Sequence, residues 1–297
     1  MPSAGQKKVK EILRNQCFCS ESGKREKGFA GMEFGSIASG SSGNCIFASS
    51  DYSSVLIDTG ISCKRIVEGL KLYNHKMEDL SGILITHEHS DHIAGLGVIC
   101  RKYHIPVYAT AATIRQIRRY SPLGKVDDAL FRVIEPDRPF HINDLKVEAF
   151  RISHDAADPV AYRVESGNKA VAVATDMGCY SQYQVDHLQD LDAVLVESNH
   201  DENMLEVGPY PYPLKRRIMG EKGHLSNSAA GMLLCDILND HMKTAYLGHL
   251  SKQNNYAALA YATVTSEITL NEDCPYREGD IPILVASRDM PMELLEL

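Results

Sequence analysis

The chain alternates short apolar runs with polar, turn-forming segments, a pattern typical of proteins that combine strands and helices. Among the first 120 residues, the apolar runs predict strands at residues 33–38, 45–48, 54–57, 83–86 and 106–108. Helical patterns occupy residues 63–72, 93–103 and 110–120, and Ser62 is a suitable N-cap for the first of them. The order of these elements predicts the α/β class.

The pattern changes after residue 130. Alternating apolar and polar positions predict an antiparallel region with strands at residues 131–134, 140–142, 145–152, 160–165 and 170–175. Three later strands, at residues 192–197, 243–247 and 281–286, alternate with helices at residues 211–219, 229–238 and 255–265. The chain has no repeat of the short period found in solenoid proteins, and its two halves could form equivalent strand layers.

Charge sets the N-terminal segment apart from the rest. Residues 1–31 are polar and contain seven Lys or Arg against three Glu, a net charge of +4. We expect a basic, poorly ordered extension that need not be native, followed by one domain over residues 32–297. The whole chain carries −8, so that domain carries −12. This is unusual for a protein that binds nucleic acid through its phosphates.

Composition also bears on the cellular compartment. The chain has no run of 18 apolar residues, and no apolar segment typical of a secretory signal stands near its start. Cys45, Cys63, Cys100 and Cys235 lie in apolar or helix-like surroundings, which is typical of reduced, buried thiols. We therefore predict a cytoplasmic protein without a membrane partner.

Candidate metal ligands follow the predicted strand at residues 83–86. His87, His89, Asp91 and His92 lie within six positions, and a strand that ends in a tight loop can direct several of them into one cleft. Imidazole and carboxylate groups suit zinc, manganese or iron. The alternative is a polar loop that happens to be rich in histidine, which would leave buried imidazoles unsatisfied. The loop therefore predicts a metal site.

Other polar residues follow predicted strands in the same way. Asp58 is either an Asx-turn residue or a carboxylate that orients a ligand imidazole. His154 and Asp176 follow two later strands, where either residue alone would be ordinary. Downstream of the first cluster, the two together are better interpreted as further ligands.

The segment at residues 39–44, Ser-Gly-Ser-Ser-Gly-Asn, joins the first two predicted strands. Its backbone N–H groups and the side chains of Ser41, Ser42 and Asn44 could hold a phosphate. The same segment is equally compatible with a glycine-rich hairpin that needs positive φ angles.

This ordered series of residues resembles the metallo-β-lactamase superfamily, whose αββα sandwich holds metals at one edge of its sheets. The resemblance covers nearly all of residues 32–297 and implies two mixed sheets packed face to face, with helices outside. The matching residues are His87, His89, Asp91 and His92 for the H-x-H-x-D-H signature, then Asp58, His154, Asp176 and His249.

The resemblance implies two divalent ions per chain, Zn²⁺ or Mn²⁺, with Fe²⁺ as a further candidate. In this assignment His87, His89 and His154 hold the first ion, Asp91, His92 and His249 hold the second, and Asp176 bridges both. Three ligands per ion and a shared carboxylate leave a position open for water. We therefore expect a metal-bridging hydroxide that attacks a phosphodiester.

Within the superfamily the chain is most similar to the YycJ (WalJ) branch, through its motifs at residues 40–44, 197–201, 223–227 and 249–251. That resemblance implies a nuclease, a 5′→3′ exonuclease with DNA as its nucleic-acid partner. We expect Asp91, Asp176 and His224 to carry catalysis, with His224 as a general acid or a phosphate contact rather than a helix-capping residue. Further candidate phosphate contacts are Ser41, Ser42, Asn44, Ser251 and His200, the last being equally compatible with a structural role.

Two other functions remain open. The first is another hydrolase of this fold, acting on a small cyclic phosphodiester, a lactone or a thioester. β-Lactamases of the superfamily typically lack the second His of the motif, which is His92 here, and glyoxalase II adds a helical domain after the core. The second is a metal-binding partner protein without activity, against which the full ligand set argues. Only 73 positions separate Asp176 from His249, too few for the large inserted domain of the long RNA-processing members.

Overall fold

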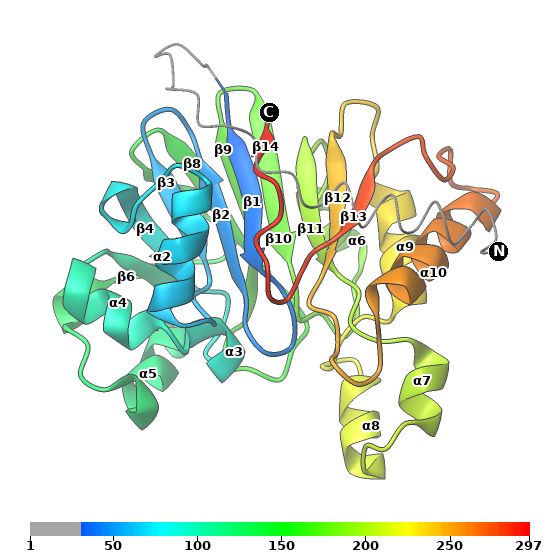
Figure 1. Cartoon of the computed structure of the whole chain (residues 1–297), viewed down its shortest axis with the longest axis horizontal. Coiled ribbons are helices and arrows are strands. Elements are labelled where there is room, and N and C mark those ends of the chain that lie inside the picture. The colour runs from blue at the N-terminus through cyan, green and yellow to red at the C-terminus, as the bar shows by residue number, and fades with distance from the viewer. Residues whose placement is uncertain (1–30) are drawn as a thin grey trace. The chain divides into compact units, whose positions relative to one another are not determined.

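The computed structural model describes residues 31–297, which form two seven-stranded sheets packed face to face with helices outside (Figure 1). The predicted αββα arrangement of the α/β class is confirmed. The expectation of a poorly ordered N-terminal extension concerns residues that lie outside the described ones, apart from Gly31.

The first sheet comes mainly from the N-terminal half of the chain. Its strands lie in the order β14, β1, β2, β3, β4, β5, β6. The pairs from β14 to β3 are antiparallel, and those from β3 to β6 are parallel. The strand bounds are β1 (Glu33–Ala38), β2 (Cys45–Ser49), β3 (Ser54–Ile57), β4 (Leu80–Leu84), β5 (Val107–Thr110), β6 (Phe131–Ile134) and β14 (Leu295–Glu296).

The second sheet repeats this topology. Its order is β13, β12, β11, β10, β9, β8, β7, with antiparallel pairs from β7 to β10 and parallel pairs from β10 to β13. The two halves therefore do form equivalent strand layers. The bounds are β7 (Phe140–Ile142), β8 (Leu145–Arg151), β9 (Val160–Ser166), β10 (Lys169–Ala174), β11 (Ala193–Glu197), β12 (Thr244–Gly248) and β13 (Ile283–Val285).

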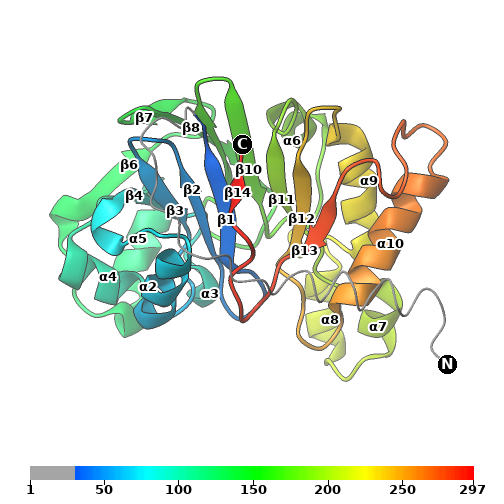
Figure 2. The ribbon, with the colours of Figure 1, turned by 45° about the horizontal axis from the view of Figure 1, so that its top comes forward.

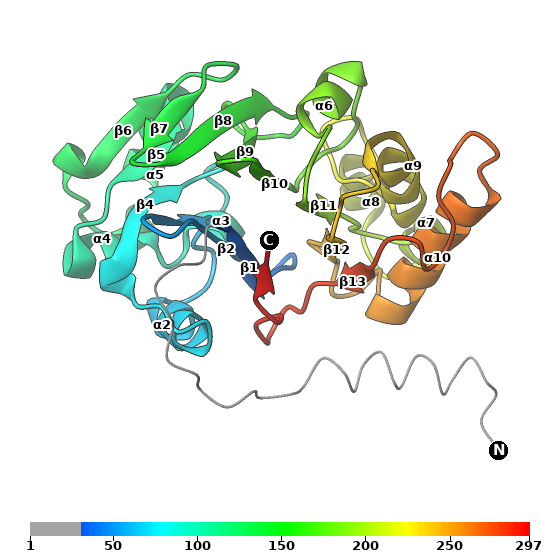
Figure 3. The same ribbon diagram turned by 90° about the horizontal axis from the view of Figure 1, so that it is seen from above.

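Helices cover the outer face of each sheet (Figures 2 and 3). The first sheet carries α2 (Cys63–Leu72), α4 (Leu96–Tyr103) and α5 (Ala111–Arg119), and the second carries α6 (Gln182–His187), α9 (Asn227–Ile237) and α10 (Ala257–Leu270). The predicted N-cap is confirmed, because Ser62 accepts a hydrogen bond from the N–H of Arg65. None of the helices in the described part of the chain has the length and apolarity of a membrane span.

Strand periodicity explains the three apolar layers. Successive side chains of a strand point to opposite faces. On β3, Leu56 packs with Ile66 of α2 on the outer face, whereas Val55 and Ile57 pack between the two sheets. Burying one such side chain stabilises the fold by about 1.5–3 kcal/mol. A strand that is buried on both faces is therefore a continuous apolar run in the sequence.

The predicted bounds are wrong for two elements next to residues 87–92, which we call the metal loop. The strand predicted at residues 83–86 is β4, which ends at Leu84, because the N–H of Thr86 donates to Asp58 at 2.9 Å instead of to a neighbouring strand. The helix predicted at residues 93–103 is split into α3 (Ser90–Ile93) and α4. The break follows from Gly95, whose N–H donates to the carbonyl oxygen of Thr59 at 2.8 Å.

Other differences concern the middle of the chain. Strand β6, predicted to belong to the antiparallel region, pairs in parallel with β5 in the first sheet, since alternation determines which face is buried but not which strand is the neighbour. The short helices α6 and α7 (Glu202–Val207) and the strand β14 have no counterpart in the prediction. Of the cysteines expected to be buried, Cys63 and Cys235 are only half-buried.

The candidate site residues follow strands that end at the same edge of the sandwich. Asp58 follows β3, His87 follows β4, Asp176 follows β10, and His249 follows β12. In Figure 1 this edge is the lower one, beside α3 and α8 (Tyr212–Ile218). Ligand sites of α/β sheets commonly lie outside the carboxyl ends of strands, so the fold places the predicted ligands together.

Candidate metal centre and active site

The structure brings all seven predicted ligands together. They fall into overlapping groups whose possible ligand atoms lie within 4.8 Å of one another: His87 with His89 and His154, His87 with His92 and Asp176, and Asp91 with His92 and His249. A fourth group joins Asp176 and His249 to Glu197 and His224. The binding of metal by these residues stays a prediction, but their proximity agrees with it.

His87 and His89 follow a strand of the first sheet, and they lie opposite His154, which follows a strand of the second sheet. The ring centroid of His87 lies 4.6 Å from that of His89 and 5.0 Å from that of His154. Nδ1 of His154 lies 3.0 Å from the carbonyl oxygen of Gly223, so Nδ1 carries the proton. Nε2 is then unprotonated and lies 3.3 Å from Nδ1 of His89. Burial and the neighbouring His92 hold the pKa of His87 well below its ordinary value, so this imidazole is neutral, the form that binds metals.

His92 is fixed by Asp58. Nδ1 of His92 lies 2.7 Å from Oδ2 of Asp58, and the other oxygen of Asp58 accepts the N–H of Thr86. This contact favours the interpretation of Asp58 as the carboxylate that orients a ligand, because it leaves Nε2 of His92 facing the centre. Nε2 of His249 and Nε2 of His92 lie 3.3 and 3.5 Å from Oδ2 of Asp91.

Asp176 lies between the two groups of ligands. Its Oδ2 is 3.1 Å from Nε2 of His92, and its Oδ1 is 3.7 Å from Nε2 of His154. Burial alone would raise the pKa of Asp176, but the imidazoles of His249 and His92 hold it well below the usual range. The carboxylate is therefore ionised and has one oxygen near each group, as a bridging ligand requires.

Three of the strand-end residues have left-handed backbone conformations. The φ angles are 62° at Asp58, 61° at Asp176 and 54° at His249. For residues other than glycine this region is uncommon, with Asp, Asn and His as the more frequent exceptions. Such conformations concentrate at functional sites, where the surrounding structure holds them in place.

Glu197 is a site residue that the sequence reasoning missed. It is fully buried at the end of β11, and its Oε1 lies 2.8 Å from Nδ1 of both His224 and His249. Its Oε2 accepts the backbone N–H groups of Met177 and Leu225. The signal was present in the sequence, since Glu197 is an acidic residue at the end of an apolar strand, close to the positions that Asp58 and Asp176 occupy after theirs.

Nδ1 of His224 is therefore engaged by Glu197, whereas its Nε2 is available. Burial alone would lower the pKa of His224, but the adjacent Glu197 carboxylate raises it above its ordinary value. The side chain is 16% exposed, so Nε2 can meet a bound molecule. This geometry suits a proton donor or a phosphate contact better than a helix cap, and Ser226 caps α9 instead.

The predicted phosphate contacts of the β1–β2 loop have two different environments. Ser41 and Ser42 are exposed. Asn44 is buried, and its Oδ1 accepts the N–H of Gly40 at 3.0 Å while its Nδ2 lies 3.2 Å from Nε2 of His92. The amide of Asn44 thus connects the loop to the candidate ligand, whereas the serine hydroxyls are open to a substrate.

His200 and Ser251 lie in the loops that support the site. Burial lowers the pKa of His200 to about 4, and its carbonyl oxygen accepts the N–H of Asn227. The hydroxyl of Ser251 accepts the N–H of Asn254 at 3.3 Å. Both residues are buried, and a phosphate contact by either stays a prediction.

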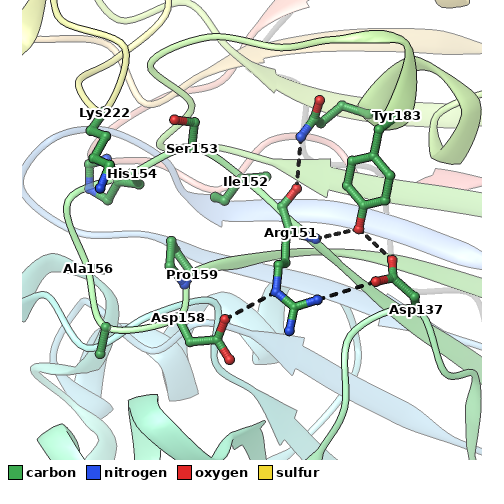
Figure 4. Close-up of a pocket in the computed structure, with 12 residues that line it drawn as sticks. Asp137, Arg151, Ile152, Ser153, His154, Ala156, Asp158, Pro159, Tyr183 and Lys222 are labelled. Atoms are coloured by element: carbon green, nitrogen blue, oxygen red, sulfur yellow. Dashed lines mark hydrogen bonds and ion pairs between the residues drawn. The ribbon is translucent and has the colours of Figure 1, made fainter.

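A groove leads away from His154 (Figure 4). Its central residue is Arg151, which lies between two carboxylates, 3.4 Å from Asp137 and 3.4 Å from Asp158. The hydroxyl of Tyr183 also donates to Asp137 at 2.5 Å. The lining holds two basic residues, Arg151 and Lys222, against the two acidic residues Asp137 and Asp158, so this groove is not a cationic channel.

The donor set fits divalent metal ions. Nε2 of His87 is buried without a hydrogen-bond partner among residues 31–297, which is an unsatisfied position that a cation would fill. The neighbouring imidazoles are oriented by a carbonyl oxygen or a carboxylate on their other nitrogen, as in known metal sites. Imidazole and carboxylate donors suit zinc, manganese and iron.

Fold and site together define a class of protein. The chain matches the family described as "Beta-lactamase superfamily domain" over residues 53–250. It belongs to the metallo-β-lactamase superfamily, and it is a metal-dependent hydrolase. The family resemblance of the sequence is confirmed.

Particular relatives identify the branch. The chain is 39% identical over 238 residues to "Exodeoxyribonuclease WalJ" of Streptococcus pneumoniae serotype 2 (strain D39 / NCTC 7466), which covers 80% of this chain and 88% of the relative. It is 39% identical over 235 residues to "Exodeoxyribonuclease YycJ" of Bacillus anthracis, with 79% and 88% covered. The solved structure of Zn²⁺-bound PqqB from Methylobacterium extorquens shares the fold, with a TM-score of 0.67, 14% identity, and 88% of this chain and 99% of that chain covered.

Proposed function

We propose that this protein is a 5′→3′ DNA exonuclease with a dinuclear metal centre. The observation that carries the proposal is His224, held by Glu197 at 2.8 Å beside Asp176 and His249 of the seven donor residues. In this proposal a metal-binding cluster and a proton donor lie side by side, as phosphodiester hydrolysis requires. The relatives named exodeoxyribonucleases support DNA as the substrate.

The proposed ligand assignment follows the groups of donor atoms. His87, His89 and His154 would hold one divalent ion, Asp91, His92 and His249 would hold the other, and Asp176 would serve as a ligand to both. The proximity of each trio supports this division. Zn²⁺ and Mn²⁺ are the proposed metals, because both accept mixed imidazole and carboxylate donors.

The protein groups have separate roles in the proposed reaction. When bound, the divalent ions would activate a water molecule and stabilise the negative charge that develops on the phosphate. As the phosphorus–oxygen bond breaks, Nε2 of His224 donates a proton to the leaving oxygen, and Glu197 stabilises the imidazolium before that transfer. Such a positioned acid contributes about 10²–10⁴-fold to the rate. Asp58 and the carbonyl of Gly223 keep His92 and His154 in orientation.

The test uses single- and double-stranded DNA and RNA labelled at either end, with Mn²⁺ or Zn²⁺ added. We expect metal-dependent removal of nucleotides from the 5′ end of DNA. Removal from the 3′ end would contradict the proposed direction. No cleavage of any nucleic acid, together with hydrolysis of a lactone or a thioester, would overturn the function.

A double variant provides the control for contaminating nucleases. His89→Ala combined with Asp91→Ala removes one donor from each proposed site and should abolish cleavage. The matched control is His141→Ala combined with Asp144→Ala, which changes the same residue types at exposed positions on and beside β7. Equal low activity in wild type and the His89/Asp91 variant would favour a metal-binding partner without activity.

A further inference from the structure

Arg288 lies at the rim of the candidate site, in the segment that follows β13. The N–H of Ser39 donates to the carbonyl oxygen of Ser287 at 3.0 Å, so this segment runs beside the β1–β2 loop (Figure 1). Nη2 of Arg65 donates to the carbonyl oxygen of Arg288 at 2.9 Å. The backbone of Arg288 is therefore held on both sides.

The guanidinium of Arg288 is packed against the same loop. Its Nη2 donates to the carbonyl oxygen of Leu250 at 2.7 Å. A Cβ atom added to Gly40 would lie 3.4 Å from its Cγ, Nε and Cζ atoms, so the side chain lies directly over the glycine. Its Nη1 is buried and has no hydrogen-bond partner among the described residues. One donor group of the guanidinium is thus unsatisfied within the protein.

The charge of Arg288 is only partly offset, because the adjacent, exposed Asp289 carboxylate attracts it without forming an ion pair. Arg151 and Arg217, which also border the site, form ion pairs with Asp137 and Asp155 respectively. Arg288 forms no such pair with any described residue, and partial burial lowers its pKa. A half-buried cation without an ion-pair partner is costly for the folded protein. It is therefore the kind of group that a bound anion would satisfy.

The position of Arg288 connects it to the proposed metal ligands. Its hydrogen-bond acceptor Leu250 directly follows His249. The hydroxyl of Ser39 accepts the N–H of His249 at 2.9 Å, and Asn44 at the other end of the loop contacts His92. An anion bound beside Arg288 would therefore lie next to the Asp91, His92 and His249 group.

We propose that Arg288 and the exposed hydroxyls of Ser41 and Ser42 form a subsite for a backbone phosphate next to the one that is cleaved. The inference rests on the proposed function and specifies how the substrate strand is held. It would also help a domain with a charge of −12 to bind DNA, because a guanidinium without an ion-pair partner can bind phosphate locally.

Binding without cleavage tests the subsite directly. The probe is a fluorescent single-stranded DNA oligonucleotide, titrated with protein in EDTA at several salt concentrations and followed by anisotropy. For Arg288→Gln we expect affinity to fall about ten-fold or more. We also expect the slope of log affinity against log salt to become shallower by about 0.7, the value for one phosphate contact on a single strand. Arg288→Lys should recover part of the salt slope.

The matched control is Arg277→Gln. Arg277 also donates to a backbone carbonyl oxygen, that of Cys274 at 2.5 Å, but in the loop after α10. This variant should bind the oligonucleotide as wild type does. Unchanged affinity and salt slope in Arg288→Gln would overturn the subsite.

A small substrate separates substrate binding from a structural role. Bis(p-nitrophenyl) phosphate contains only one phosphate, so Arg288→Gln should lose far less kcat/KM on this ester than on DNA. An equal loss on this ester and on DNA would show that Arg288 maintains the metal loop, and would overturn the subsite. If wild type binds the oligonucleotide with the expected salt slope but never cleaves it, the proposed exonuclease function fails while the subsite stands.

Discussion

Glu197 connects two imidazoles that have different proposed tasks. A single oxygen of this carboxylate lies 2.8 Å from Nδ1 of His224, the candidate proton donor, and 2.8 Å from Nδ1 of His249, a candidate ligand. Both imidazoles consequently present Nε2 to the cleft. At the scale of single residues, the orientation of the catalytic and metal-binding groups depends on the same buried charge.

Replacement of His224 by Ala should separate catalysis from metal binding. We expect the variant to keep both metals and to lose about 10²–10⁴-fold in kcat, because only the proton donor is removed. Metal content by mass spectrometry and turnover on labelled DNA measure the two effects. Loss of one metal equivalent would instead identify His224 as a ligand.

Replacement of Glu197 by Gln should affect both functions. The amide keeps the size of the side chain but is neutral, and its NH₂ group cannot accept the backbone N–H groups of Met177 and Leu225 as Oε2 does. We expect metal affinity to fall about 10–100-fold, the usual effect of losing a group that orients a ligand, and turnover to fall with it. Competition with a chelating dye measures the affinity. Glu206→Gln, an exposed change on α7, should leave both unchanged.

The sequence pattern predicted the candidate metal ligands better than the residues that orient them. His87, His89, Asp91 and His92 lie close together in the sequence, so their chemistry could be predicted from spacing. Glu197 acts on residues 27 and 52 positions away, and no local pattern contains that information. Strand-end position alone predicts a candidate, and the fold determines what it contacts.

At the scale of elements, the metal loop is held by the turn that follows β3. The N–H of Gly60 donates to the carbonyl oxygen of Asn44 at 2.7 Å, and the N–H of Asn44 donates to that of Asp91 at 2.9 Å. A Cβ atom on Gly60 would lie 1.6 Å from the carbonyl oxygen of Asp91. This turn and α3 can pack so closely only because residue 60 has no side chain.

Gly60→Ala should therefore displace the metal loop. We expect a loss of about 1–3 kcal/mol in the free energy of unfolding, the usual cost of overpacking, and weaker metal binding because Asp91 must move. Thermal unfolding and metal titration measure the two effects. A variant as stable and as metal-bound as wild type would show that the turn can relax without the ligands.

Element prediction succeeded where local patterns determine the structure. The strands at residues 33–38, 54–57, 131–134 and 140–142 match β1, β3, β6 and β7 in their bounds, because each is a short apolar or alternating run between turn residues. The break between α3 and α4 could not be predicted, since it depends on a hydrogen bond from Gly95 to the distant Thr59. The sheet partner of β6 is likewise a tertiary property.

At the scale of the whole domain, both sheets contribute to one centre. Strand ends of the first sheet supply His87 to His92, and those of the second supply His154, Asp176 and His249. Bound metal would therefore connect the two layers across their edge. Any ion that binds the folded state only must also stabilise that state.

Metal addition should consequently raise the melting temperature, and EDTA should lower it. At a metal concentration of about 100 Kd, one site contributes about 2.7 kcal/mol, which corresponds to about 5–10 °C for a domain of this size. The increase should shrink as the pH falls, because protons compete for the imidazole ligands. This competition starts at high pH for His249: burial alone would lower its pKa, but the Asp176 carboxylate raises it to about 10. Differential scanning calorimetry measures it, and the His89/Asp91 double variant should show no comparable increase.

The left-handed backbone at Asp58, Asp176 and His249 also restricts how this fold can change in evolution. Only glycine, asparagine and a few similar residues adopt that conformation cheaply, whereas a β-branched residue costs roughly 1–2 kcal/mol. A descendant that abandons hydrolysis can exchange Asp176 for asparagine or glycine and still fold. Homologues that have lost their metals should therefore carry asparagine or glycine at these three positions, and not a random set of residues.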